Sequence, residues 1–310
     1  MSRVVRTIAG DLPAELLGPT YAHEHLIIDT PLVARSMPQI HLHSVEEARN
    51  EVQTCIEVGV RAMVDAMPAA SGRDPQRLTR ISMLTGMRIV AATGLHTAKY
   101  YEGVPWTSAE TAEELAERFI ADIEVGIDTN DYLGEEIVRS TARAGIVKVA
   151  ALSEELSPRD RRLFQAGAIT NEATGAAVLT HAEAGLGGLT QIDTLLSYGV
   201  APDRIALSHT DRIIDPAYHR SMLETGVFLC YDQGLRDGES TFALVDRMAD
   251  EGFAGQIVLG TDGARRSLWS TLGGSPGLAA LYQMAERRLE PLLVEKLFVE
   301  NPARYLSLAA

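Results

Sequence analysis

The stretch Gly145–Leu152 reads GIVKVAAL and indicates the fold class. It is an almost continuous apolar run without the alternation of a half-exposed strand, which is typical of a strand buried on both faces in a parallel sheet. Its one charged residue is Lys148. A lysine in such a strand bears a large desolvation cost unless it is neutralised or modified. The same stretch therefore also indicates a functional site.

Seven further apolar runs recur along the chain, with helical patterns between them. The runs are Thr20–Ile28, Arg61–Met67, Arg88–His96, Ala176–Ala182, Arg204–His209, Val227–Tyr231 and Gln256–Asp262. We expect helices over Val45–Val58, Asp74–Thr85, Ala109–Val125, Leu189–Tyr198, Pro216–Glu224, Thr241–Glu251, Pro276–Arg287 and Pro291–Phe298. This alternation predicts an α/β fold, and eight strands predict a single (β/α)8 TIM barrel. A doubly wound open sheet has the same alternation and stays an alternative.

The size and composition of the chain suit one barrel and argue against some partners. Such barrels run near ~250 residues as one unit, and no linker divides the 310 residues, so we expect a single barrel domain over residues 1–310. The net charge of −14 argues against nucleic acid or an anionic membrane as the main partner. No apolar run approaches the ~18–20 residues that span a bilayer. Cys55 and Cys230 lack metal-ligand spacing, which fits a reducing, cytoplasmic location.

Residues of metal-ligand type stand at the C-terminal ends of five expected strands, the end at which barrel enzymes carry their chemistry. Taken singly they are weak signals, because a His-x-His pair is more often a surface feature and Asp262-Gly263 could be an ordinary turn. Taken together, they make coincidence improbable. We predict a metal centre formed by His23, His25, Lys148, His181, His209 and Asp262.

The types of these residues predict the chemistry of the site. Imidazole and carboxylate groups suit Zn²⁺, with Mn²⁺ or Co²⁺ as alternatives. An ammonium group cannot bind a cation, but a buried lysine of lowered pKa can react with CO₂, so we expect Lys148 to carry a carbamate that bridges two divalent ions per chain. A bridging water becomes hydroxide near neutral pH and attacks a carbonyl or phosphorus centre. Asp262 would transfer its proton to the leaving group.

Seven short motifs, in order along nearly the whole chain, resemble the phosphotriesterase-like family of the amidohydrolase superfamily. They are Tyr21–His25, Ala92–Leu95, Arg143–Ala150, Thr180–His181, Ser208–Arg212, Gly260–Asp262 and Asn301–Arg304. The resemblance implies that His23, His25 and Asp262 bind one metal and His181 and His209 the other, with Lys148 shared. It also implies a homodimer, and a substrate that is a lactone or an organophosphate triester.

The expected substrate pocket departs from the hydrophobic type found in organophosphate hydrolases. His96 stands where many family members carry Trp or Tyr, and the region around it is similar to members that act on sugar lactones, some of them phosphorylated. We expect the substrate to contact His96, Tyr100, Tyr231 and Arg265. The guanidinium of Arg265 could hold a phosphate or carboxylate in a bidentate manner. A solvated pair or a local salt bridge for Arg265 and Arg266, and simple packing of the tyrosines, stay open.

The leading hypothesis is a binuclear metal-dependent lactonase for hydrophilic or anionic lactones, including phosphorylated sugar lactones. The alternative is an organophosphate hydrolase of the aryldialkylphosphatase type. A metal-binding protein without turnover is a third hypothesis, and a mononuclear deaminase is disfavoured because such enzymes lack the lysine on the fourth strand. We expect Glu24, between the two histidines, to form a structural ion pair, and we assign no role to His41, His43 and His219.

Overall fold

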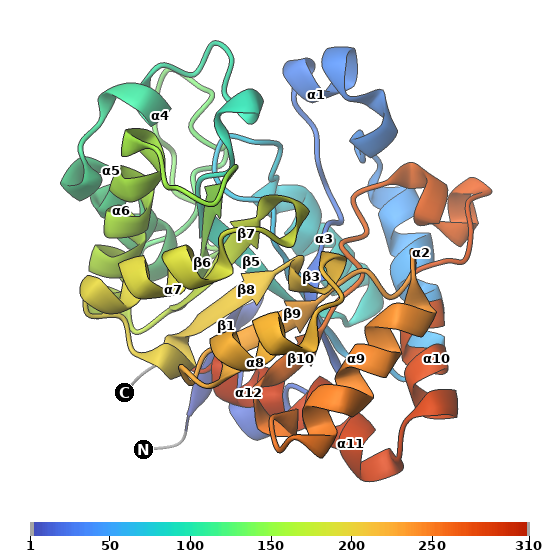
Figure 1. The fold of residues 1–310 in the computed structure, drawn as a ribbon. Helices are drawn as coiled ribbons and strands as arrows, with labels where there is room; N and C mark the ends of the chain where they lie inside the picture. Colours follow the sequence, from blue (N-terminus) through green and yellow to red (C-terminus); the bar gives the residue numbers. More distant parts are fainter. Residues whose placement is uncertain (1–2, 309–310) are drawn as a thin grey trace.

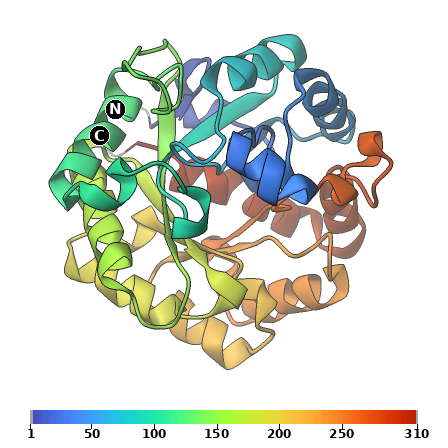
Figure 2. The same cartoon turned by 90° about the horizontal axis from the view of Figure 1, so that it is seen from above.

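The computed structural model describes residues 3–308 and contains a ring of eight parallel strands surrounded by helices (Figures 1 and 2). The strands, in order around the ring, are β3 (Thr20–Glu24), β4 (Ala62–Asp65), β5 (Arg88–Gly94), β6 (Ala144–Ala151), β7 (Ala177–Ala182), β8 (Ile205–Ser208), β9 (Phe228–Tyr231) and β10 (Ile257–Leu259). The N–H groups of Thr261 and Asp262 donate to the carbonyl oxygen of His23, each at 3.1 Å, and join the last strand to the first. The predicted (β/α)8 barrel is confirmed, and the open sheet is excluded.

Two glycines allow neighbouring strands to approach closely near their C-terminal ends. A Cβ at Gly260 would lie 2.6 Å from both the backbone nitrogen and the backbone oxygen of His23. A Cβ at Gly94 would overlap the carbonyl oxygen of Lys148, which instead accepts a hydrogen bond from the N–H of Leu95 at 3.0 Å. Larger residues at either position would push apart strands that carry predicted site residues.

The helices cover the outside of the ring (Figure 2). They are α2 (Val45–Glu57), α3 (Pro75–Thr85), α5 (Ala112–Glu124), α6 (Pro158–Thr174), α7 (Gly188–Ser197), α8 (Pro216–Leu223), α9 (Gly238–Asp250), α10 (Ala280–Arg288), α11 (Pro291–Glu295) and α12 (Asn301–Tyr305). Two short helices, α1 (Pro31–Ser36) and α4 (Trp106–Ala109), lie in loops beyond the strand ends. Among residues 3–308, the length and apolar character that a bilayer-spanning helix needs occur together in no helix.

Helix α6 was not expected from the sequence. Its buried residues include Ala166, Gly167 and Ala168, so the apolar stripe that usually marks a helix is weak. These small residues let the helix approach the sheet closely, since a Cβ on Gly167 would lie 2.9 Å from a methyl of Val149. Its ends carry clear signals, because Ser157 forms a capping box with Asp160 and Gly175 is left-handed at φ 71°.

A hairpin that the sequence analysis did not predict, β1 (Val4–Thr7) with β2 (Gly10–Pro13), lies at the N-terminal end of the barrel. The N–H of Ile8 donates to the carbonyl oxygen of Ile89 at 2.8 Å, near the start of β5. Val5, Tyr305 and Leu306 pack with the inward-facing residues of the strands. This end of the barrel is therefore filled with apolar side chains, and polar chemistry is confined to the opposite end.

A buried ionic network fixes the loop after β4. The side chain of Arg73 is fully buried, with Nη1 3.1 Å from Asp122 Oδ2 and Nη2 2.6 Å from Asp131 Oδ1. Nη1 also donates to the carbonyl oxygen of Ala92 at 2.7 Å, so one guanidinium joins β5, α5 and the segment after α5. Removing one partner of a buried ion pair leaves a charge without compensation.

We expect the substitution Arg73→Met to lower the free energy of unfolding by about 3–5 kcal/mol, because the buried carboxylate of Asp131 would lose its cation and Asp122 would keep only Arg139 as a partner. Urea denaturation measures this change. Arg77→Met is the control, since Arg77 pairs with Asp29 at a partly exposed site and should change stability by about 1 kcal/mol or less. Equal losses in the two variants would contradict the role given to Arg73.

Candidate active site

A cavity of about 590 Å³ opens at the C-terminal ends of the strands. Five of the six predicted metal ligands line it: His23, His25, His181, His209 and Asp262. The sixth, Lys148, lies in the barrel interior and is only 1% exposed. Residues from β3, β6, β7 and the segments after β8 and β10 are thus brought together, as the strand-end argument predicted.

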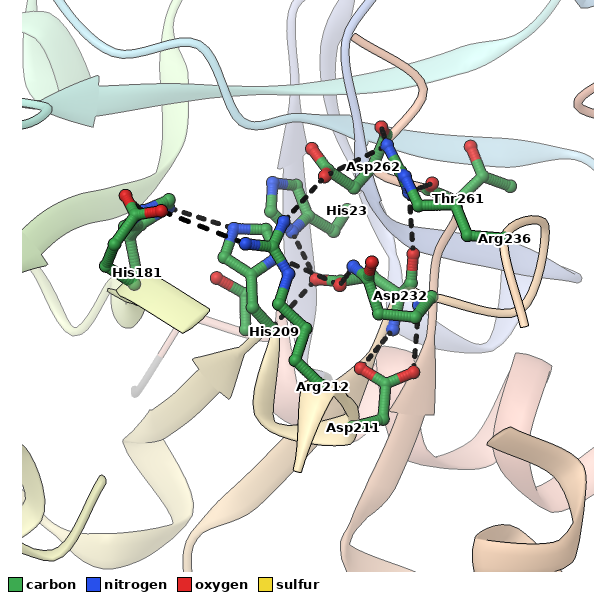
Figure 3. Close-up of polar contacts among 12 residues, drawn as sticks. His23, His181, His209, Asp211, Arg212, Asp232, Arg236, Thr261 and Asp262 are labelled. Atoms are coloured by element: carbon green, nitrogen blue, oxygen red, sulfur yellow. Dashed lines mark hydrogen bonds and ion pairs between the residues drawn. The ribbon is translucent and has the colours of Figure 1, made fainter. Parts of the chain in front are cut away.

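Asp232, which follows β9, holds two of the histidines through one carboxylate (Figure 3). Its Oδ2 lies 2.9 Å from Nδ1 of His23, and its Oδ1 lies 2.9 Å from Nδ1 of His209. Burial acts to raise the pKa of Asp232, but the adjacent His209 and His23 hold it well below its ordinary value. An ionised carboxylate only accepts hydrogen bonds, so the Nδ1 atoms of both rings carry a proton, and Nε2 is the nitrogen that each ring leaves for another partner.

His181 is held in the opposite tautomer. Its Nε2 lies 3.0 Å from Oε2 of Glu183, and its Nδ1 lies 2.9 Å from Nε2 of His209. Burial lowers the pKa of His181 to about 3, so the ring is neutral near pH 7. With Glu183 accepting the proton of Nε2, Nδ1 of His181 carries a lone pair and faces Nε2 of His209. Either a proton in a hydrogen bond or a cation bound by both nitrogens satisfies this pair.

Lys148 has the environment of a lysine kept close to neutrality. Its Nζ donates to Oγ of Ser208 at 3.2 Å, and within residues 3–308 it forms no ion pair with a carboxylate. Burial lowers its pKa to about 8, which raises the fraction of neutral amine near pH 7. Neutral amine is the form that reacts with CO₂. The alternative of a buried Lys–carboxylate pair is not found.

Asp262 and His25 complete the set at the other side of the cavity. Nε2 of His25 lies 3.5 Å from Oδ1 of Asp262, and its buried Nδ1 has no hydrogen-bond partner within the described chain. Asp262 is left-handed at φ 45°. Its backbone oxygen accepts a hydrogen bond from Nη2 of Arg236 at 2.8 Å, and the same nitrogen lies 3.3 Å from Oδ2 (Figure 3).

The donor set fits a divalent cation. Ligand atoms of His23, His209 and Asp262 all lie within 4.8 Å of one another. Nδ1 of His181 adjoins this group, 2.9 Å from Nε2 of His209, and Nδ1 of His25 is buried without a hydrogen-bond partner within the described chain. Neutral imidazoles with a carboxylate are the ligands that Zn²⁺ and similar ions prefer.

The predicted substrate-binding residues are only partly brought to the cavity. His96, Tyr100 and Arg265 line it, and the rings of His96 and Tyr100 lie 4.3 Å apart. The expectation for Tyr231 is corrected, because its side chain is fully buried outside the cavity lining and its hydroxyl bonds to Nδ1 of His219 at 3.0 Å. Side chains alternate along a strand, and Tyr231 lies on the outer face of β9.

The structure also tests the expectations for two further residues, Arg266 and Glu24. Arg266 donates to the carbonyl oxygen of His41 at 3.1 Å and pairs with Glu47 at 3.3 Å, so the local salt bridge is the correct interpretation for it. Glu24 forms no ion pair within the described chain. It accepts hydrogen bonds from the backbone N–H and the hydroxyl of Thr261 at 2.8 and 2.6 Å, and burial raises its pKa to about 8.

Comparison with known proteins agrees with this geometry. Residues 3–306 match the model of the phosphotriesterase family. The chain belongs to the phosphotriesterase family. A phospho-furanose lactonase of Mycoplasmopsis agalactiae is 31% identical over 74% of this chain and 66% of its own length. A phospho-furanose lactonase of Mycoplasmopsis synoviae is 29% identical over 99% and 92%. The crystal structure of a lactonase from Listeria monocytogenes superimposes with a TM-score of 0.89, 26% identity and coverage of 99% and 100%.

Membership of the phosphotriesterase family makes this chain a hydrolase. The family assignment and the enzyme class predicted from the motifs are confirmed, and so is the coarse prediction of a metal-dependent hydrolase of lactonase or phosphotriesterase type. The individual ligand assignments, the number of metal ions and the substrate stay predictions.

Sequence reasoning missed several residues of the site. Asp232 follows the end of β9, so the rule that found Asp262 applied to it as well. Glu183 lies two residues beyond His181, which was a weaker signal. Arg212 and Arg236 reach Oδ2 of Asp262, at 3.7 and 3.3 Å, from loops whose conformation no local pattern predicts.

We expect Asp232→Ala to weaken metal binding by about 10–100-fold, because His23 and His209 lose the acceptor that fixes their tautomers. Metal content after dialysis against graded concentrations of a chelator measures the change. Asp29→Ala is the control, since Asp29 binds His41 outside the ligand set. Metal retention equal to that of the unmodified protein would show that Asp232 does not orient the ligands.

Proposed function

We propose that this family member is a binuclear metal-dependent lactonase acting on anionic lactones, phosphorylated sugar lactones included. One observation carries the choice of substrate. The cavity that holds the candidate ligands is also lined by four cationic side chains, in a chain whose net charge is −14. They are Lys99, Arg212, Arg236 and Arg265. The named activity of the two mycoplasmal relatives supports the same substrate class.

We assign His23, His25 and Asp262 to one metal ion and His181 with His209 to the other, with Lys148 between them as a carbamate. The close approach of Nδ1 of His181 to Nε2 of His209, at 2.9 Å, supports placing these two residues on the same ion. Zn²⁺ is the expected ion, with Mn²⁺ and Co²⁺ as alternatives. When bound, such a pair acidifies a shared water to hydroxide and polarises the lactone carbonyl.

The chain's own groups then move the proton and hold the substrate. Asp262 accepts the proton of the attacking water and returns it to the ring oxygen when the acyl C–O bond breaks, which leaves a hydroxy acid. Arg212 and Arg236, near Oδ2, keep this carboxylate oriented during both transfers. His96 and Tyr100 form the wall on the side of β5.

Arg265 is the residue best placed to bind the anionic end. It is exposed in the loop after β10, lines the cavity and forms no ion pair with any residue between 3 and 308. Lys99 and Arg212 lie 4.0 and 3.9 Å from Glu183, and Arg212 also approaches Asp262, so their charge is already partly compensated. A guanidinium can hold two phosphate oxygens at once.

An organophosphate triesterase is the second candidate. Part of the same cavity is lined by apolar side chains, which suit the uncharged groups of a triester: Ile28, Ile40, Met67 and Leu268.

The homodimer and the single domain over residues 1–310 likewise stay proposals.

Steady-state rates on three substrate sets separate the candidates: neutral γ-lactones, phosphorylated furanose lactones and a paraoxon-type triester. We expect the highest kcat/KM on the phosphorylated lactones, because the cationic lining compensates the added charge. The assay uses metal-loaded protein and follows acid release for lactones and phenolate release for the triester. A higher kcat/KM on the triester would overturn the proposal.

We expect Arg265→Ala to lower kcat/KM for phosphorylated lactones roughly 30-fold, which corresponds to about 2 kcal/mol. The reason is that the phosphate loses a charge-assisted contact with the guanidinium. Neutral lactones should react as before. Arg35→Ala is the matched control, because Arg35 is an exposed cation that pairs with Glu102 outside this cavity. Equal losses on neutral and phosphorylated substrates would mean that Arg265 has a structural role only.

A further inference from the structure

Residues 263–279, which form most of the loop between β10 and α10, carry Arg265 and are called the 263–279 loop below. Its first part faces the cavity through Ala264, Arg265, Ser267 and Leu268. Its second part lies against helix α2, on the outside of the barrel. The position of Arg265 therefore depends on contacts that lie away from the cavity.

The main contact of the second part is the carboxylate of Glu51, on α2. Glu51 is fully buried, and no cation pairs with it within the described chain. It accepts hydrogen bonds from the backbone N–H groups of Ser270, Thr271 and Leu278 at 3.2, 2.9 and 2.8 Å. It also accepts from the hydroxyls of Ser270 and Thr271 at 3.1 and 2.8 Å. One carboxylate thus satisfies donors from both ends of the segment 270–278.

The two parts of the loop are joined by internal contacts. The N–H groups of Ser275 and Gly277 donate to the carbonyl oxygens of Ser267 and Leu268, each at 2.9 Å. The indole of Trp269 is fully buried and donates to the carbonyl oxygen of Gly263 at 2.7 Å. A displacement at residues 270–278 is consequently passed to residues 264–268, which face the cavity.

A second acidic residue of α2 holds the cavity-facing part more loosely. Glu47 pairs with Arg266 at 3.3 Å, and both side chains are about one-third exposed. Exposed ion pairs of this kind contribute little to stability. The buried hydrogen bonds of Glu51 are therefore the stronger tie between α2 and the loop.

We propose that Glu51 is a positioning residue that sets the preference for anionic substrates by holding the 263–279 loop, and with it Arg265, at the cavity. The nature of the substrate rests on the proposed function, whereas the holding of the loop does not. Loss of the carboxylate leaves the buried N–H of Leu278 and the partly buried N–H groups of Ser270 and Thr271 without their acceptor, and the segment gains by opening to water. Arg265 then samples positions away from the anionic end of the substrate.

Three variants and one control test this proposal. Glu51→Ala removes every acceptor, Glu51→Gln keeps one acceptor oxygen, and Thr271→Val removes a single donor at an exposed position and should leave folding intact. Glu46→Gln is the matched control, because Glu46 is an exposed carboxylate on the same helix. Measurements are hydrogen exchange of peptides within residues 263–279, metal content, and kcat and KM on phosphorylated and neutral lactones.

We expect exchange in residues 270–278 to become about 10-fold faster in Glu51→Ala, with Glu51→Gln and Thr271→Val between it and the unmodified protein. The KM for the phosphorylated lactone should rise by about 10-fold, while kcat, metal content and the KM for neutral lactones change by less than about 2-fold. Glu46→Gln should change none of these quantities.

Unchanged exchange in Glu51→Ala would overturn the proposal, and so would an equal rise in KM on neutral and phosphorylated lactones. If Glu51→Ala does not fold, exchange and KM are measured in Glu51→Gln and Thr271→Val, and the same two results in those variants would overturn the proposal. An unmodified enzyme without any preference for phosphorylated lactones would instead contradict the proposed function. In that case faster exchange still supports the anchoring of the loop by Glu51, and the selectivity part is overturned.

Discussion

The site depends on one buried carboxylate that joins two imidazoles. Asp232 accepts the Nδ1 protons of His23 and His209, which lie 186 residues apart in the chain. This contact places a proton on Nδ1 of each ring and turns both Nε2 atoms away from Asp232. Glu183 binds Nε2 of His181, so Nδ1 of that ring faces Nε2 of His209 at 2.9 Å. The histidines are thereby held in place by carboxylates, and the nitrogens that could bind a cation lie close together.

The barrel explains why these groups meet. Along β6, β7 and β9 an inward apolar residue is followed two positions later by a polar one: Ile146 by Lys148, Leu179 by His181, Cys230 by Asp232. The parallel strands stack these layers, so an apolar layer lies below a polar one. Gly260 lets its strand approach the backbone of His23 closely, and Gly94 does the same for the backbone of Lys148. The apolar filling below, with Val5 and Tyr305, supplies the burial that lowers the pKa of Lys148.

Both the barrel and the grouping of the six candidate ligands could be predicted from the sequence. The pattern of buried strands predicts the barrel, and the residues at the C-terminal ends of those strands predict the site. The prediction failed where that rule was applied incompletely. In Cys230-Tyr231-Asp232, the alternation of side chains along the strand directs the first and third residues into the barrel and the tyrosine outward. The prediction that Tyr231 contacts the substrate neglects this alternation. Helix α6 was missed because its buried face consists largely of small residues that fit against Val149. The roles of Arg236 and Glu51 depend on how separate loops fold against each other, and no local pattern reports that.

The cations of the cavity divide into two groups with different consequences for substrate choice. Arg212 and Arg236 lie beside Asp262, and Lys99 and Arg212 lie beside Glu183, so an incoming anion must compete with carboxylates that are already present. Arg265 forms no such pair within residues 3–308, and an anion meets it without displacing a partner. In the proposed function, the compensated cations orient the ligand-bearing residues, and the uncompensated Arg265 distinguishes charged from neutral substrates. On this proposal, discrimination depends on the loop that carries Arg265 and the chemistry depends on the strands, so the two can vary independently on one barrel.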